Sequence, residues 1–64
     1  MGFRVHDRVV HSHYPDRAGS IVALYGALVI VLWDEGREPP TGCKYNLPQR
    51  MSKHIPGALE HVQV

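Results

Sequence analysis

The stretch "LVIVLWDEG", residues 28–36, decides the fold that this sequence predicts. Its first six residues are all apolar and rich in β-branched side chains, which favours a strand over a helix. An acidic pair and Gly36 then end the strand in a turn. Because side chains alternate along a strand, one face carries Val29, Val31 and Trp33, and the other carries Leu28, Ile30 and Leu32. Both faces of this strand are therefore apolar.

The segments before this stretch predict a hairpin preceded by a loop. Residues 20–24 form a second strand, and a tight turn centred on Gly26 joins it to 28–33 as an antiparallel hairpin. Residues 12–20 form a loop around Pro15-Asp16. Residues 3–11 read as one strand or as two short strands joined by a kink.

The segments after this stretch are short and rich in turn residues. Two prolines place residues 37–42 in a loop. We expect a short strand at 43–46, a single helical turn at 47–51, a fifth short strand at 52–55 and a tail at 57–64. Five short strands, with one helical turn before the last, predict an all-β fold. The layout is that of a single small, partly open SH3-like barrel over residues 1–64.

Several of these pieces resemble the SH3-like modules of the KOW, Tudor and mind-bomb type. The matching pieces are Asp7-Arg8-Val9-Val10, Gly19-Ser20-Ile21, the strand and turn at 29–36, and Tyr45 with Leu47. His6 stands where these families usually have glycine. The resemblance implies the SH3-like barrel, and it does not select among nucleic-acid, peptide and structural roles.

The composition excludes several classes of protein. A chain of 64 residues has room for one domain, and its single cysteine, Cys43, excludes an internal disulfide and a cysteine-based zinc site. A lone thiol favours a reducing, cytoplasmic compartment. The longest uncharged apolar stretch, residues 21–33, is too short for a membrane span of about 20 residues, so we expect no membrane partner.

The aromatic and basic residues suggest a non-catalytic binding module. Trp33 either closes the barrel end as core, with Asp34 starting the turn, or joins the tyrosines on one rim. On the second reading, aromatics interleaved with basic residues bind nucleic acid or a nucleoprotein. The candidate binding residues are Arg8, Tyr14, Arg17, Tyr25, Trp33, Asp34, Lys44 and Tyr45.

The second apolar face of strand 28–33 suggests an alternative function. If exposed to solvent, the apolar face of Leu28, Ile30 and Leu32 would promote association with other chains. We therefore expect another segment or chain to pack on it. The cover is either the tail, residues 58–64, or a partner chain, as in a homodimer. The alternative function is therefore a protein-interaction module, or a small structural subunit such as one from a phage, that docks through this face.

Catalytic and metal chemistry find little support in the sequence. The pair His11 and His13 has a spacing that can chelate a metal, but short pairs of this kind in loops are usually solvated. Cys43 has no readable acid partner or oxyanion feature, and no phosphate-binding glycine motif is present. We therefore expect no enzyme activity, no metal and no cofactor.

Overall fold

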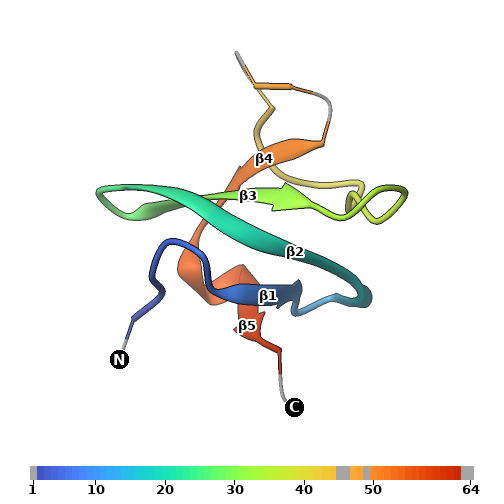
Figure 1. The fold of residues 1–64 in the computed structure, drawn as a ribbon, viewed down its shortest axis with the longest axis horizontal. Helices are drawn as coiled ribbons and strands as arrows, with labels where there is room; N and C mark the ends of the chain where they lie inside the picture. Colours follow the sequence, from blue (N-terminus) through green and yellow to red (C-terminus); the bar gives the residue numbers. More distant parts are fainter. Residues whose placement is uncertain (1, 45–46, 49, 63–64) are drawn as a thin grey trace.

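The computed structural model describes residues 2–44, 47–48 and 50–62, and it is an all-β protein. Five antiparallel strands form one sheet in the order β4-β3-β2-β1-β5. Figure 1 shows β2 crossing the molecule, with β3 and β4 on one side of it and β1 and β5 on the other. The strands are β1 (Arg8–His11), β2 (Tyr14–Tyr25), β3 (Leu28–Trp33), β4 (Met51–His54) and β5 (Leu59–His61). In the described part of the chain, no helix is long and apolar enough to cross a bilayer.

The predicted hairpin is confirmed. β2 and β3 pair antiparallel from Gly19 opposite Trp33 to Tyr25 opposite Leu28. The turn between them is made by Gly26 and Ala27, and Gly26 has φ of 55°, a value that glycine adopts without strain. The predicted alternation also holds, because the core cluster contains the three residues Val29, Val31 and Trp33.

The predicted loop at 12–20 is wrong. β1 turns into β2 over two residues, and β2 already begins at Tyr14. The turn-forming Pro15-Asp16 lies in a bulge, since His11 pairs with Tyr14 while the preceding Val10 pairs with Ala18. A bulge leaves extra residues on one strand unpaired, which is how a proline is tolerated inside a strand. The turn signal therefore marks an irregularity in β2 and not its start.

The predicted helical turn at 47–51 falls partly on residue 49, outside the described residues, and the Met51 N–H donates to the Pro48 carbonyl at 3.0 Å. Met51 is the first residue of β4, and the 3₁₀ turn of the described residues is η1 (Pro56–Ala58), directly before β5. Proline suits the first turn of a helix because its missing N–H is not needed there. Of the strand expected at 43–46, Cys43 forms a bridge with Lys53, while 45–46 and 49 lie outside the described residues.

The first strand is shorter than the predicted span 3–11. Strand pairing begins at Arg8, and the chain before it makes a turn in which the Asp7 N–H donates to the Arg4 carbonyl at 3.1 Å. His6 lies inside this turn with φ of 80°, a backbone region that favours glycine. Neither predicted form of 3–11 is therefore correct, because a turn at His6 precedes a single strand and no strand lies before it.

The described part of the tail, up to residue 62, does not cover the outer face of β3. Residues 59–61 pair with β1 as an edge strand, with His11 opposite Leu59, and Leu59 enters the core. On β3, Ile30 is 4% exposed, whereas Leu28 and Leu32 are 37% and 36% exposed. The described tail residues thus extend the sheet at the edge away from β3, and a partner chain as the cover stays a prediction.

Candidate functional site

Trp33 lies in the core and not on a binding rim. Its side chain has no exposed surface, and its indole Nε1 donates a 2.8 Å hydrogen bond to Ser52 Oγ. Gly19, on the neighbouring strand β2, pairs with Trp33. A Cβ added to this glycine would lie 2.8 Å from the Trp33 Cα. The interpretation of Trp33 as a core residue is therefore confirmed, and stacking on an external base is closed to this side chain.

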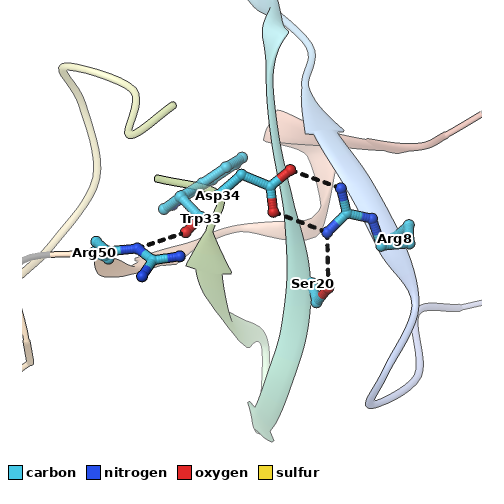
Figure 2. A network of polar contacts seen from close by, with 5 residues as sticks. All are labelled: Arg8, Ser20, Trp33, Asp34 and Arg50. Atoms are coloured by element: carbon cyan, nitrogen blue, oxygen red, sulfur yellow. Dashed lines mark hydrogen bonds and ion pairs between the residues drawn. The ribbon is translucent and has the colours of Figure 1, made fainter. Parts of the chain in front are cut away.

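Asp34 starts the turn as expected, and its side chain forms an ion pair. The Arg37 N–H donates to the Asp34 carbonyl at 2.9 Å, and Gly36 supplies the positive φ of 75°. The carboxylate accepts two hydrogen bonds from Arg8, of 2.8 and 3.0 Å, and Arg8 also donates to Ser20 Oγ at 3.0 Å (Figure 2). This geometry is the two-pronged pairing that arginine makes with carboxylates.

Four arginines gather around the turn 34–37, and we call them the arginine cluster. Figure 2 shows Arg8 reaching Asp34 on one side and Arg50 donating to the Trp33 carbonyl, at 3.2 Å, on the other. Arg17 donates to the Gly36 carbonyl at 3.2 Å. The hydrogen bond from Arg8 is the largest cause that lowers the pKa of Asp34, and the charges of Arg50 and Arg37 add to it. The candidate binding residues predicted from the sequence include Arg8 and Arg17 but neither Arg37 nor Arg50.

The tyrosines expected on one rim lie apart. Tyr14 begins β2 and is half-buried, with its ring centroid 5.2 Å from that of His11. Tyr25 ends β2 and is 65% exposed. The two occupy opposite ends of a strand of 12 residues, so they cannot share one site. Lys44 is exposed, and Tyr45 lies outside the described residues.

A row of hydrogen-bonded buried side chains crosses the core beside Trp33. Ser52 Oγ lies 2.7 Å from His54 Nε2, and Ser52 and His54 are 0% and 5% exposed. The His54 ring meets the rings of Trp33 and His11 edge-on, with centroids 5.5 and 5.3 Å away. Burial is the main cause that lowers the pKa of His54 to about 4, and the neighbouring His11 adds to it.

His11 and His13 do not form the chelating pair that their spacing allows. His11 is 3% exposed, and its Nδ1 accepts a hydrogen bond from the backbone N–H of His13 at 3.1 Å. Burial lowers the pKa of His11, and the charge of His13 lowers it further. Within the described ranges, no group of three or more His, Cys, Asp or Glu residues is placed to hold a metal ion.

The end of the sheet at the β2–β3 turn carries an apolar pocket of about 220 Å³. Exposed apolar side chains adjoin it: Tyr25 is 65% exposed, Ile55 61% and Leu24 44%. No charged residue occurs in 21–33 or in 55–59, the two segments that supply most of this surface. The pocket is lined by Gly2, Phe3, Leu24, Gly26, Val29 and Pro56. We call these lining residues, with Tyr25 and Ile55, the hairpin-end patch.

Comparison of the chain with protein-family models, with curated proteins and with solved structures finds no match.

Proposed function

We propose that the chain is a non-catalytic binding module, a partly open SH3-like barrel, that docks a protein partner through the hairpin-end patch. The observation that carries this proposal is the apolar pocket at the β2–β3 turn, with exposed apolar side chains beside it. Large apolar anchors seated in a pocket dominate the binding energy of protein interfaces.

The curl of the sheet supports the barrel part of the proposal. β1 and β4 are three places apart in the strand order, which in a flat sheet is roughly 14 Å. The rings of His11 and His54, one from each strand, nevertheless lie 5.3 Å apart. This short distance between the two rings supports a sheet that curls across the core. The positive φ of His6, where the resembled families usually have glycine, fits the same architecture.

The size and charge of the patch support a protein as the partner. Sites for small molecules usually enclose roughly 300–1,000 Å³, so a pocket of about 220 Å³ suits one side chain better than a cofactor. Nucleic acid is bound mainly through cations that neutralise its phosphates, and the two segments that supply most of the patch, 21–33 and 55–59, carry no charge. An apolar segment of a protein has the complementary chemistry.

Peptide selection tests this proposal. Displayed random peptides of about 12 residues are selected on the immobilised chain, and an enriched peptide is titrated into the ¹⁵N-labelled protein. We expect enriched peptides to share one large apolar residue, and the amides of Leu24, Gly26 and Val29 to shift. Leu24→Lys should abolish binding, because a charge at the pocket wall must be desolvated. Leu32→Lys, at a similarly exposed position outside the patch, is the matched control.

The outcomes separate this patch from the other candidate surface and from self-association. Binding lost in Leu32→Lys and kept in Leu24→Lys would move the docking site to the outer face of β3 and overturn the proposal. A full-length dimer in sedimentation equilibrium that Leu24→Lys dissociates would identify the partner as a second copy. A selection that enriches no apolar peptide, with a monomeric chain, would also contradict the proposal.

The arginine cluster favours nucleic acid as the second candidate function. Arg8, Arg17, Arg37 and Arg50 come from four separate segments to one turn, where their guanidinium groups could contact phosphates. In this case a single-stranded oligonucleotide binds more weakly as salt rises, and Arg17→Ala with Arg37→Ala weakens binding and flattens the salt dependence. Arg4→Ala, outside the cluster, is the control. No binding of oligo(dT) at low salt would exclude this candidate.

A further inference from the structure

The buried pair His11 and His54 is not used by either proposed binding surface. The two rings come from β1 and β4, and they meet edge-on in the core with 3% and 5% exposure. Buried imidazoles that touch each other are unusual, because either ring, if protonated, brings a charge into an apolar site beside the other.

The hydrogen bonds around His54 assign it a neutral form. Trp33 Nε1 is only a donor, so Ser52 Oγ accepts from it, and we assign the Ser52 hydrogen to the bond with His54 Nε2. The ring proton of His54 is then on Nδ1. A proton added at Nε2 would face the Ser52 hydroxyl and force that hydrogen to turn away, in a site where Ser52 has no exposed surface. Protonation therefore breaks a satisfied chain of hydrogen bonds.

The same logic holds for His11. Its Nδ1 accepts from the His13 N–H, so its ring proton is on Nε2, which lies 3.3 Å from Thr41 Oγ1. A proton added at Nδ1 would place two donors against each other and remove the bond to His13. Both rings thus accept a new proton only at a nitrogen that is already occupied by a hydrogen bond.

The loop between β3 and β4 closes over both rings. Gly42, with φ of 101°, lies so close to His54 that an added Cβ would be 2.5 Å from its Cε1. Thr41 contacts His11, and Pro39 is fully buried. Cys43 then exchanges two backbone hydrogen bonds with Lys53, of 3.2 and 2.8 Å. Residues 39–43 therefore depend on the positions of the two imidazoles.

The side chains around the pair offer no counter-charge. The rings of His13 and Tyr14 lie 5.9 and 5.2 Å from that of His11, and Cys43 and Lys53 bridge beside His54. Ser52, Thr41 and Trp33 complete the contacts and are uncharged. No carboxylate among these neighbours could stabilise an imidazolium.

We propose that His11 and His54 form an acid-sensitive clasp, whose protonation separates the two rings and releases residues 39–43 from the sheet while β2 and β3 stay paired. The driving force is the cost of burying an imidazolium and of placing its new N–H against another hydrogen-bond donor. The loop 39–43 is the segment that detaches. It yields first because it is held by two backbone hydrogen bonds and the ring contacts, whereas β2 and β3 share a ladder of six residue pairs.

Histidine and amide NMR over pH 8 to 3.5 tests the clasp. We expect the Cε1–H signal of His54 to titrate far below the ordinary range of histidine. At the same midpoint, the amides of Cys43 and Lys53 should lose protection from hydrogen exchange, while those of Ala23 and Ile30 keep theirs. The variant His54→Gln assigns the transition to this ring, and it should remove the loop transition. His13→Gln keeps the backbone bond to His11 and should retain the transition.

Three results would overturn the clasp. The first is a His54 signal that titrates in the ordinary range of histidine and leaves the loop amides unchanged. The second is simultaneous loss of protection in the loop and in β2–β3, which would be global unfolding. The third is an unchanged loop transition in His54→Gln. If that variant does not fold, His11→Asn replaces it, and the titration of the unmodified chain still decides the first two points.

Discussion

The indole N–H of Trp33 donates a 2.8 Å hydrogen bond to the hydroxyl of Ser52, and neither side chain has any exposed surface. The two residues lie on neighbouring strands, β3 and β4, and Ser52 passes the interaction on to His54. A buried donor is satisfied in this way, and the largest side chain of the core is fixed in one orientation. This relationship explains why a serine is placed at a fully buried position.

Ser52→Ala should destabilise the fold by about 1–3 kcal/mol, because it leaves the indole N–H of Trp33 buried without an acceptor. Urea unfolding followed by tryptophan fluorescence measures the change. Ser20→Ala is the control, since Ser20 accepts from Arg8 at the exposed surface, and we expect a change within about 0.5 kcal/mol. Equal losses in the two variants would contradict the role given to Ser52.

Gly42→Ala should destabilise more than Gly36→Ala. Both glycines have positive φ, so both substitutions carry a backbone penalty of about 1 kcal/mol or more. At Gly42 the new Cβ also meets the His54 ring, whereas at Gly36 nothing lies within 4 Å. The difference should shrink when His54 is also replaced by alanine, and a double-mutant cycle measures this coupling. A difference that is independent of His54 would place the clash elsewhere.

Stability should fall as the pH drops from about 6.5 to about 4. The pKa of His54 is lowered from 6.5 to about 4 in the folded chain, so between these values the unfolded chain binds more protons. The contribution of neutral His54 to the free energy of unfolding is fully present above pH 6.5. It is lost progressively down to pH 4, by up to about 3 kcal/mol. Urea titrations at pH 7.5, 6.5, 5.5 and 4.5 measure the slope, and His54→Gln should flatten it.

The carboxylates act in a separate pH window. The pKa values of Asp7 and Asp34 are lowered from 3.8 by hydrogen bonds, so their contributions are present above that value and are lost only at lower pH. A loss between pH 6.5 and 4.5 that persists in His54→Gln and in His11→Asn would therefore rule out the histidines as its source.

The ion pair Arg8–Asp34 should contribute less than about 1 kcal/mol, although its geometry is good. Its side chains are 49% and 46% exposed, so water screens the attraction and salt weakens it further. A double-mutant cycle with Arg8→Ala and Asp34→Asn, in 0.05 M and 1 M NaCl, measures the coupling energy. A value well above 1 kcal/mol that does not depend on salt would show that the pair is shielded from solvent.

The sequence predicted what depends on neighbouring residues. The alternation in 28–33, the glycine at 26 and the turn at Asp34 are local signals, and each is confirmed in β3, the hairpin and the turn 34–37. A local turn signal predicted the wrong structure where it lies inside a longer paired strand. Pro15-Asp16 favours a turn, but β2 runs through it as a bulge because its flanking residues pair with β1.

The candidate sites depended on distant residues, and there the sequence was insufficient. Tyr14 and Tyr25 appeared as members of one rim, yet the length of β2 holds them at opposite ends of the sheet. Arg50 was absent from the predicted site, although it contacts the Trp33 carbonyl 17 residues away. Neither fact can be read from composition or spacing, because both follow from strand register and length.

By itself, the sequence determined the all-β class, the β2–β3 hairpin and the burial of one face of β3, since these follow from the two-residue period of a strand and from turn chemistry. Only the tertiary structure decided that Arg8 meets Asp34, that His11 meets His54 under Gly42, and that the tail joins β1. The physical reason is that the Arg8–Asp34, His11–His54 and β1–β5 contacts join residues 26 to 52 positions apart, and they arise only when the register and curl of the whole sheet are set.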